Sequence, residues 1–158
     1  TMDSMDKEVY KKKAMDFLHG KTVLVLGTAS KEGSPHASML LYCVDEDFNF
    51  YFMTHTDSLK AGHIRDNNMG SIVVGDDGDD LHVQASGTVE LMEDQDKASR
   101  IVERLLEKKP ERGGQWPLMK MKGADYGMYK FSPEHMRLID LTTIDNPEDP
   151  NTFIQILP

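Results

Sequence analysis

The residues with the clearest chemical meaning lie in a short polar loop and at the start of the helix predicted after it. Thr54 ends a run of aromatic and apolar residues, and Ser58 and Lys60 follow it within six positions. The first N–H groups of a helix have no partner inside the helix, and the helix dipole is positive at that end. Two hydroxyl groups and an ammonium group at such a place can bind a phosphate monoester. The loop therefore predicts a phosphate site, with His55 and Leu59 beside it.

A second informative stretch is the predicted hairpin of residues 22–44, which lies upstream of the phosphate motif. The turn signal Lys31-Glu32-Gly33-Ser34 separates its two strands. The backbone of the far strand could lie beside a flat aromatic ring. A ring on that strand and a phosphate at the helix start together indicate a phosphorylated planar cofactor, for which FMN is the best candidate.

The elements that must position these residues follow from hydrophobic periodicity and from turn signals. Helices are expected at residues 6–18, 58–66 and 94–108. Strands are expected at residues 22–29, 36–44, 48–54, 71–74, 81–91, 128–131 and 136–141. Gly87 marks a bulge or a point of close approach within its strand. Short strands with a few helices predict an α+β protein built on an antiparallel β-barrel of about six to seven strands.

Length and composition set the outer limits of the interpretation. A chain of 158 residues is expected to form a single domain over 1–158, with its core at about 20–141 and a tail at 142–158. The net charge of -9 argues against nucleic acid and anionic membranes as partners, and no apolar run reaches the ~20 residues of a membrane helix. A single cysteine, Cys43, cannot form an internal disulfide, which predicts a cytoplasmic protein.

The order of the motifs resembles the FMN-binding split-barrel family related to pyridoxamine 5'-phosphate oxidase. The resemblance extends over about residues 22–141. It rests on Gly33-Ser34-Pro35-His36 leading into Ser38-Met39-Leu40-Leu41-Tyr42, and on Phe52-Met53-Thr54 followed by Ser58-Leu59-Lys60-Ala61 and Ile64. No single one of these motifs is specific for the family, but the fixed order and spacing of the motifs are. The resemblance implies a split barrel and a homodimer with two FMN sites at the subunit interface, each formed by both chains.

The resemblance also implies roles for individual residues. The strand from Ser38 to Cys43 would run along the edge of the isoalloxazine ring and bind it through its backbone. Thr54 would contact the phosphate or the ribityl chain, Ser58 and Lys60 would bind the phosphate, and His82 stands where the family often has a glutamine facing the flavin. The complete set of expected cofactor-binding residues is Ser38, Met39, Leu40, Leu41, Met53, Thr54, His55, Ser58, Leu59, Lys60 and His82.

Three departures from the family pattern indicate a relative of the oxidase and not the oxidase itself. Leu59 stands where the oxidases have a second cation, so the phosphate would gain one charge-assisted contact fewer, worth about 1.5–3 kcal/mol. Cys43 replaces a lysine near the substrate phosphate, and the C-terminal segment has no Arg-x-His arrangement. We therefore expect an FMN-dependent oxidoreductase of unknown small-molecule substrate, with NAD(P)H or a reduced small molecule as the electron donor.

Other interpretations of the same residues stay open. The protein could bind or sense FMN without catalysis, because the cations that would recognise the oxidase substrate are missing. The split barrel could instead hold haem or a deazaflavin, with His82 or His135 as candidate haem ligands. No metal site is expected, because His36, His55 and His63 lack a partnered carboxylate at ligand spacing.

Two further features allow a structural and a functional interpretation. Cys43 sits in an apolar strand and is expected in the core. Trp116 is either a core residue or a wall of the substrate pocket. Lys120 and Lys122, beside it, could supply the positive charge that Leu59 does not.

Overall fold

The computed structural model describes residues 4–108, 126–143 and 153–158. The helices are α1 (Ser4–Gly20), α2 (Leu59–Asp66), α3 (Gln95–Glu107) and a short 3-10 turn, η3 (Leu141–Thr143). The strands are β1 (Val23–Ala29), β2 (Pro35–Leu41), β3 (Cys43–Val44), β4 (Phe50–His55), β5 (Met69–Val74), β6 (Leu81–Leu91), β7 (Tyr126–Asp140) and β8 (Phe153–Leu157). Trp116, Lys120 and Lys122 lie outside the described residues.

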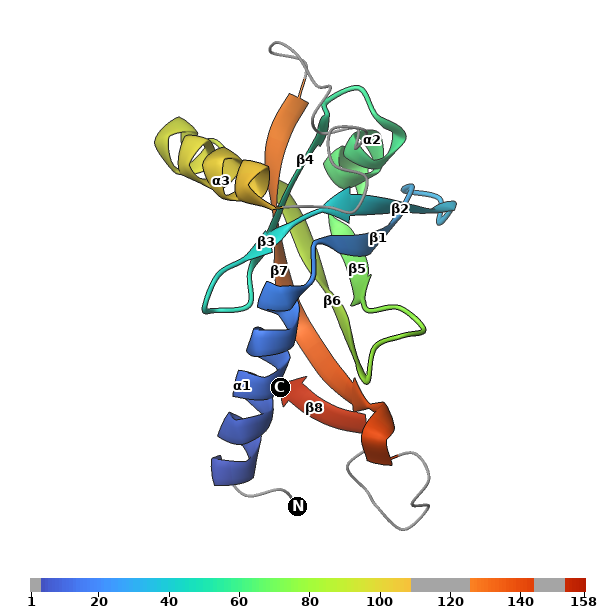
Figure 1. Cartoon of the computed structure of the whole chain (residues 1–158). Helices are drawn as coiled ribbons and strands as arrows, with labels where there is room; N and C mark the ends of the chain where they lie inside the picture. Colours follow the sequence, from blue (N-terminus) through green and yellow to red (C-terminus); the bar gives the residue numbers. More distant parts are fainter. Residues whose placement is uncertain (1–3, 109–125, 144–152) are drawn as a thin grey trace.

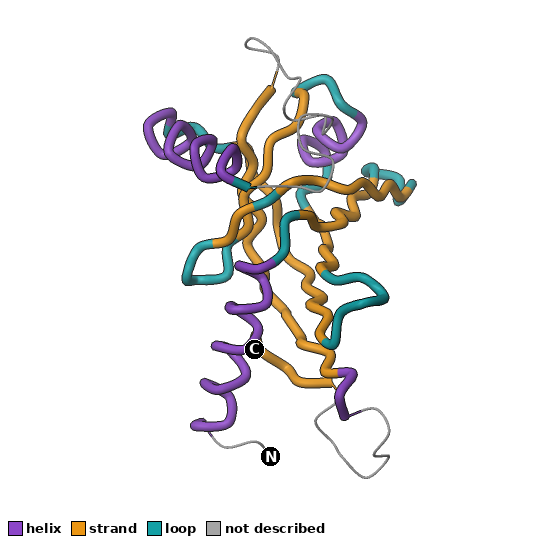
Figure 2. The backbone as a smooth tube through the Cα atoms, in the orientation of Figure 1, coloured by secondary structure: helices purple, strands orange, loops and turns teal. Residues whose placement is uncertain are grey.

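The strands form one curled antiparallel sheet with the order β2-β1-β5-β6-β7-β4-β3, and β8 pairs with β7. The α+β split-barrel fold is therefore confirmed. In the described ranges the sheet has eight strands, one more than expected. Figure 1 shows α2 and α3 at one end of the molecule and α1 with β8 toward the other. In Figure 2 the strands run through the middle of the molecule and the helices lie at its edges. None of the described helices is long and apolar enough to cross a bilayer.

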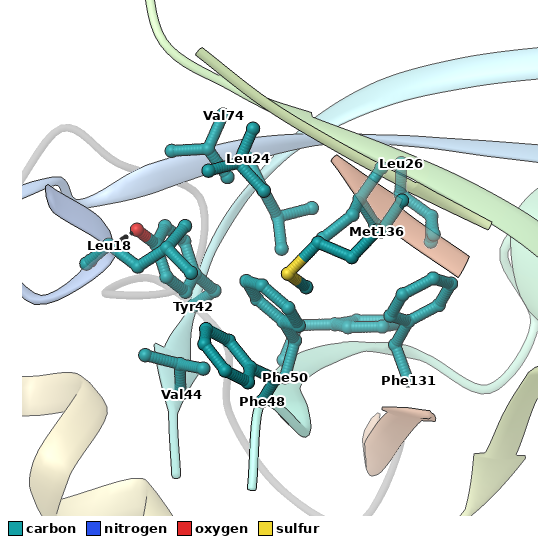
Figure 3. Packing of buried hydrophobic residues seen from close by; sticks show 14 of the residues in the cluster. Leu18, Leu24, Leu26, Tyr42, Val44, Phe48, Phe50, Val74, Phe131 and Met136 are labelled. Carbon is teal, nitrogen blue, oxygen red and sulfur yellow. Dashed lines mark hydrogen bonds between the residues drawn. The ribbon is translucent and has the colours of Figure 1, made fainter. Parts of the chain in front are cut away.

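Strand β4 carries buried side chains on both of its faces. Phe50 and Phe52 point into the main core inside the curled sheet, whereas Tyr51 and Met53 pack in a second cluster under α3. Figure 3 shows part of the main core, in which Phe50 lies among side chains from several strands and from the end of α1. Because both faces are covered, the strand reads as a continuous apolar run.

The strand expected at 36–44 is interrupted at Tyr42. Tyr42 is fully buried, its backbone N–H donates to Thr22 O, and its hydroxyl donates to Leu18 O at the end of α1. Before the interruption β2 pairs with β1, and after it β3 pairs with β4. The break lets one segment change partners as the sheet curls, which a single-sequence pattern does not show.

The two closing strands expected at 128–131 and 136–141 are one continuous strand, β7. Its pairing with β6 shifts register between Ser86 and Gly87, so the predicted irregularity at Gly87 is confirmed. A Cβ at Gly87 would lie 2.0 Å from Ser132 O, and Pro133 follows there. The bulge accommodates a proline that would otherwise remove a ladder hydrogen bond.

The remaining differences concern the ends of elements. Helix α1 is longer than the expected 6–18, and Asp94 caps α3 instead of belonging to it. Strand β4 starts at Phe50 and not at 48, because Phe48 adopts a left-handed turn conformation with φ 64°. The segment expected as a tail, 142–158, contains β8, whose Ile154 and Ile156 are buried in the main core. The core therefore extends beyond residue 141.

Candidate functional site

The start of α2 brings Thr54, Ser58 and Lys60 together. Ser58 is the N-cap of α2 and accepts a hydrogen bond from Ala61 N–H at 3.2 Å. Thr54 Oγ1 donates to Ser58 Oγ at 3.3 Å, and Lys60 Nζ donates to Thr54 Oγ1 at 3.1 Å. The phosphate motif of the sequence is thus a compact group of two hydroxyls, one amine and a helix N-terminus.

Lys60 is the charged member of this group, and its environment favours an anion. Within the described residues, no carboxylate forms an ion pair with it, although the chain carries a net charge of -9. Burial lowers the pKa of the Lys60 amine below its usual value. An anion beside the amine would offset this desolvation. The group therefore fits a phosphate, which the helix N-terminus also attracts.

The hydroxyl of Ser38 on β2 is a further feature of interest. Its Oγ is buried and has no hydrogen-bond partner among the described residues. A buried hydroxyl without a partner is costly, and such groups in native proteins mark a strained or ligand-binding position. Ser38 pairs with Leu26, a main-core residue, so its hydroxyl lies on the core side of β2, and its contact with a ring edge stays a prediction.

The other expected contact residues do not converge on Lys60 with their side chains. Leu40 is buried in the main core, whereas Leu41 and Met53 are buried under α3. Met39 and Leu59 are exposed, and so is His55 at the end of β4. Contacts from these residues to a cofactor through their backbone stay a prediction.

Within one chain, His82 lies far from the group formed by Thr54, Ser58 and Lys60. It pairs with Ile139 on β7, whereas Thr54 pairs with Gly127 at the other end of the same strand. Twelve residues of β7 separate these positions, which corresponds to roughly 40 Å of strand. The His82 ring is already hydrogen-bonded, with Nε2 2.7 Å from Asp76 O. His82 and Lys60 of one chain therefore cannot contact the same small ligand.

The sequence reasoning missed a buried polar pair behind α2. His63 Nδ1 lies 3.1 Å from Thr28 Oγ1 on β1, and the rings of His63 and His36 meet edge-on at 6.2 Å. The available signal was the spacing of Lys60 and His63, which places both on neighbouring positions of one helix face. Within the described ranges, His, Cys, Asp and Glu side chains form no group of three able to hold a metal ion.

A second group of cations lies on the α3 side of the sheet. Cys43 is buried, as expected, and lines a pocket of about 230 Å³ with Arg104, Lys108 and His19. Arg104 donates to Val44 O at 2.9 Å and Lys108 to a backbone carbonyl at the same distance. These cations bind main-chain carbonyls, whereas Lys60 has only a hydroxyl partner in the described part of the chain.

Comparison with known proteins places this geometry in a family. The family model described as pyridoxamine 5'-phosphate oxidase matches residues 10–140, which include β1 to β7 and all the candidate site residues. The chain belongs to the pyridoxamine 5'-phosphate oxidase family. The family resemblance inferred from the motif order is thereby confirmed, and the fold of this family is of the flavin-binding type.

Solved structures of low sequence identity share the fold of this family member. General stress protein 26 from Bacillus anthracis str. Sterne is 21% identical, with a TM-score of 0.65 over 82% of this chain and 93% of that one. A protein related to general stress protein 26 from Clostridium acetobutylicum is 19% identical, with a TM-score of 0.63 over 84% and 89%. The heme storage protein HutZ from Vibrio cholerae is 15% identical, with a TM-score of 0.64 over 82% and 92%. A search of curated protein sequences found no significant match.

Proposed function

We propose that this protein binds FMN and acts as an FMN-dependent oxidoreductase on a small molecule. The observation that carries the proposal is the half-buried amine of Lys60, joined to two hydroxyls at the start of α2 and without a described acidic partner. Membership in the pyridoxamine 5'-phosphate oxidase family supports a flavin as the ligand. The departures at Leu59 and Cys43 support a substrate other than that of the oxidase.

In this proposal the chain's own groups divide the binding of the cofactor. Lys60 Nζ, Ser58 Oγ and the N–H groups at the start of α2 hold the phosphate, and Thr54 keeps the amine in place. The backbone from Ser38 to Leu41 and the Ser38 hydroxyl bind the polar edge of the ring. Bound FMN supplies two-electron transfer, whereas the protein sets access and orientation. The electron donor in this proposal is NADPH or NADH.

The absorbance spectrum of the purified protein tests the ligand first. Flavin gives two broad bands, whereas haem gives a sharp Soret band. Mixing the flavin-loaded protein with NADPH or NADH in a stopped-flow instrument then tests catalysis, because an oxidoreductase bleaches the flavin bands within seconds. A flavin that stays oxidised with both donors would favour a binding or sensing protein.

Titration with FMN and with riboflavin tests the phosphate contact. We expect Lys60→Ala to weaken FMN binding at least tenfold and to leave riboflavin binding unchanged, because riboflavin has no phosphate. Lys12→Ala is the matched control, since Lys12 is exposed on α1 and pairs with Asp16. Equal FMN affinity of Lys60→Ala and the parent protein would contradict the assignment.

Haem is the second candidate ligand, because HutZ, a heme storage protein, shares the fold. His135 is exposed on β7 and would be the candidate ligand, since the His82 ring is held by Asp76 O. A Soret band in the parent protein that shifts in His135→Ala would favour haem over FMN.

We also propose a homodimer formed through the outer face of β2, β1 and β5. On this face Met39, Val25 and Val73 form a cross-strand row of exposed apolar side chains. The neighbouring row consists of the small residues Ala37, Gly27 and Ser71, which line a groove of about 540 Å³. A ridge beside a groove on an uncharged face can pack against a second copy of itself. In the dimer, His82 would reach the flavin from the partner subunit.

A reducing compartment fits the single cysteine, which is buried. We therefore retain the cytoplasm as the proposed location.

A further inference from the structure

The buried polar side chains of the described residues are few, and one pair among them has no role in the site described above. These side chains are Thr28, Thr54, His63 and Asp140. Thr54 belongs to the candidate phosphate site with Ser58 and Lys60. Asp140 accepts hydrogen bonds from Lys13 Nζ at 2.8 Å and from the Thr142 N–H. Thr28 and His63 bind each other at 3.1 Å and thereby join β1 to α2.

The pair is a weak source of stability. A buried hydrogen-bonded pair is often no better for folding than apolar side chains of the same shape, because both partners lose their hydration. Valine and leucine at these positions would fill the same space without that loss. Buried polar groups of this kind can instead specify one orientation, because a hydrogen bond is directional and apolar packing is not.

The hydrogen bond between Thr28 and His63 can specify the rotation of α2 about its own axis. The helix has eight residues, and its buried apolar contacts come from Ala61 and Ile64. A short helix with two buried apolar side chains can roll with little change in buried area, and the hydrogen bonds from Arg65 to Thr56 O and from Asn67 to Ser30 O join it only to loop backbone. With side chains a helix is about 10–12 Å wide, so a roll of roughly 20° moves a side-chain group by about 2 Å. That displacement breaks a hydrogen bond such as the one between Lys60 Nζ and Thr54 Oγ1.

We propose that His63 and Thr28 are positioning residues for the phosphate site, because their hydrogen bond limits the roll of α2 at its buried face and so helps to place Lys60 Nζ beside Thr54 Oγ1. The proposal rests on the proposed function. The contact survives either direction of donation: the Thr28 hydroxyl can donate to a bare Nδ1, and a protonated Nδ1 can donate to the hydroxyl. The edge-on ring of His36 packs against His63 and limits its rotamers.

The test measures the ratio of the FMN and riboflavin dissociation constants. Thr28→Val keeps the shape of the side chain and removes the hydroxyl, and His63→Leu removes the ring nitrogen. We expect each variant to weaken FMN binding five- to twentyfold and to change riboflavin binding less than twofold. His63→Asn should restore most of the ratio, because its amide can reach the position of Nδ1. The double variant Thr28→Val, His63→Leu should be no worse than either single variant.

A matched control separates positioning from general loosening. Tyr51→Phe removes another hydrogen bond, to Asp45 Oδ2 at 2.8 Å, and the Tyr51 side chain packs in the cluster under α3. It should lower thermal stability and leave the ratio unchanged. NMR titration of the Lys60 side chain adds a measurement without flavin: in Thr28→Val we expect the pKa of Lys60 to move up toward its ordinary value, because the amine becomes solvated.

The outcomes distinguish this inference from the proposed function. A parent protein that binds FMN and riboflavin equally overturns both. A parent that prefers FMN, with Thr28→Val and His63→Leu variants that keep the same preference and the same Lys60 titration, overturns the positioning role alone. Equal weakening of FMN and riboflavin in these variants also overturns it, because the helix roll acts on the phosphate.

Discussion

At the scale of single residues, the important feature is a half-buried cation, Lys60, that has no charged partner among the residues the structure describes. Lys60 is half-buried and donates to a hydroxyl, which does not neutralise it. A charged amine in that position costs free energy unless an anion is present. If the proposed phosphate site is right, the stability of the free protein and its affinity for FMN should respond oppositely to changes at this residue.

The pH dependence of FMN binding follows from the lowered pKa of Lys60. Only the ammonium form attracts phosphate, so affinity should fall as the pH rises through a value below the usual 10.5. Below about pH 6 affinity should also fall, because the phosphate takes up its second proton. Riboflavin binding should show neither effect. In the free protein the sign is reversed: charged Lys60 destabilises the fold, and this cost disappears as the pH rises toward 10.5. Isothermal titration at pH 5 to 10 measures both ligands.

Ser38 gives a second prediction at the same scale. Replacement of Ser38 by Ala removes a buried hydroxyl that has no described partner, so the unfolding free energy of the free protein should rise by about 1 kcal/mol. Affinity for FMN and riboflavin should fall by the same factor, because the proposed contact is to the ring. Denaturant unfolding and flavin titration measure the two effects. A variant that loses stability would show that the hydroxyl has a partner in the free protein.

At the scale of elements, the long β7 strand and its partner β6 form the axis of the sheet. Their pairing extends from Leu81 to Leu91 on β6 and contains the register shift at Gly87. This bulge lets β7 continue past Pro133, and the continuity of β7 holds β4, and therefore Thr54, in the sheet.

Gly87→Ala tests this account of the bulge. A methyl group at Gly87 would lie 2.0 Å from Ser132 O, so one of the two strands must move. We expect the unfolding free energy to fall by about 3 kcal/mol or more. Gly62→Ala on α2 is the control, because its nearest contact is the flexible end of Arg65 at 3.6 Å. Urea unfolding measures the difference, and an equal effect of the two substitutions would contradict the close-approach argument.

At the scale of the whole molecule, the net charge limits where a second copy of the chain can bind. A chain with a net charge of -9 repels a second copy unless the two meet on uncharged surface. The rows through Val25 and Gly27 provide such a surface over three adjacent strands. The proposed dimer therefore depends on this face staying apolar.

Val73→Glu should disrupt the proposed dimer. A carboxylate in the apolar row would lose its hydration on dimer formation, so we expect a monomer at micromolar concentration where the parent is a dimer. Val9→Glu is the control, because Val9 is an exposed apolar residue on α1, away from that face. Sedimentation equilibrium measures the mass. A parent protein that sediments as a monomer would exclude the proposed dimer.

The sequence by itself determined several local elements and the grouping of Thr54, Ser58 and Lys60, because these depend on residues close together in the chain. Alternation, turn residues and the cap at Ser58 act over a few positions, so β6, α2 and the group of Thr54, Ser58 and Lys60 were predictable. The tertiary structure decided what depends on distant partners. Distant partners decide that the strand is interrupted at Tyr42, that β7 is one continuous strand and that β8 packs in the core. They also place His82 far from Lys60 and bring Thr28 within hydrogen-bond distance of His63. Each of these follows from how the sheet curls, because curling sets which distant backbones meet, and no local pattern records that.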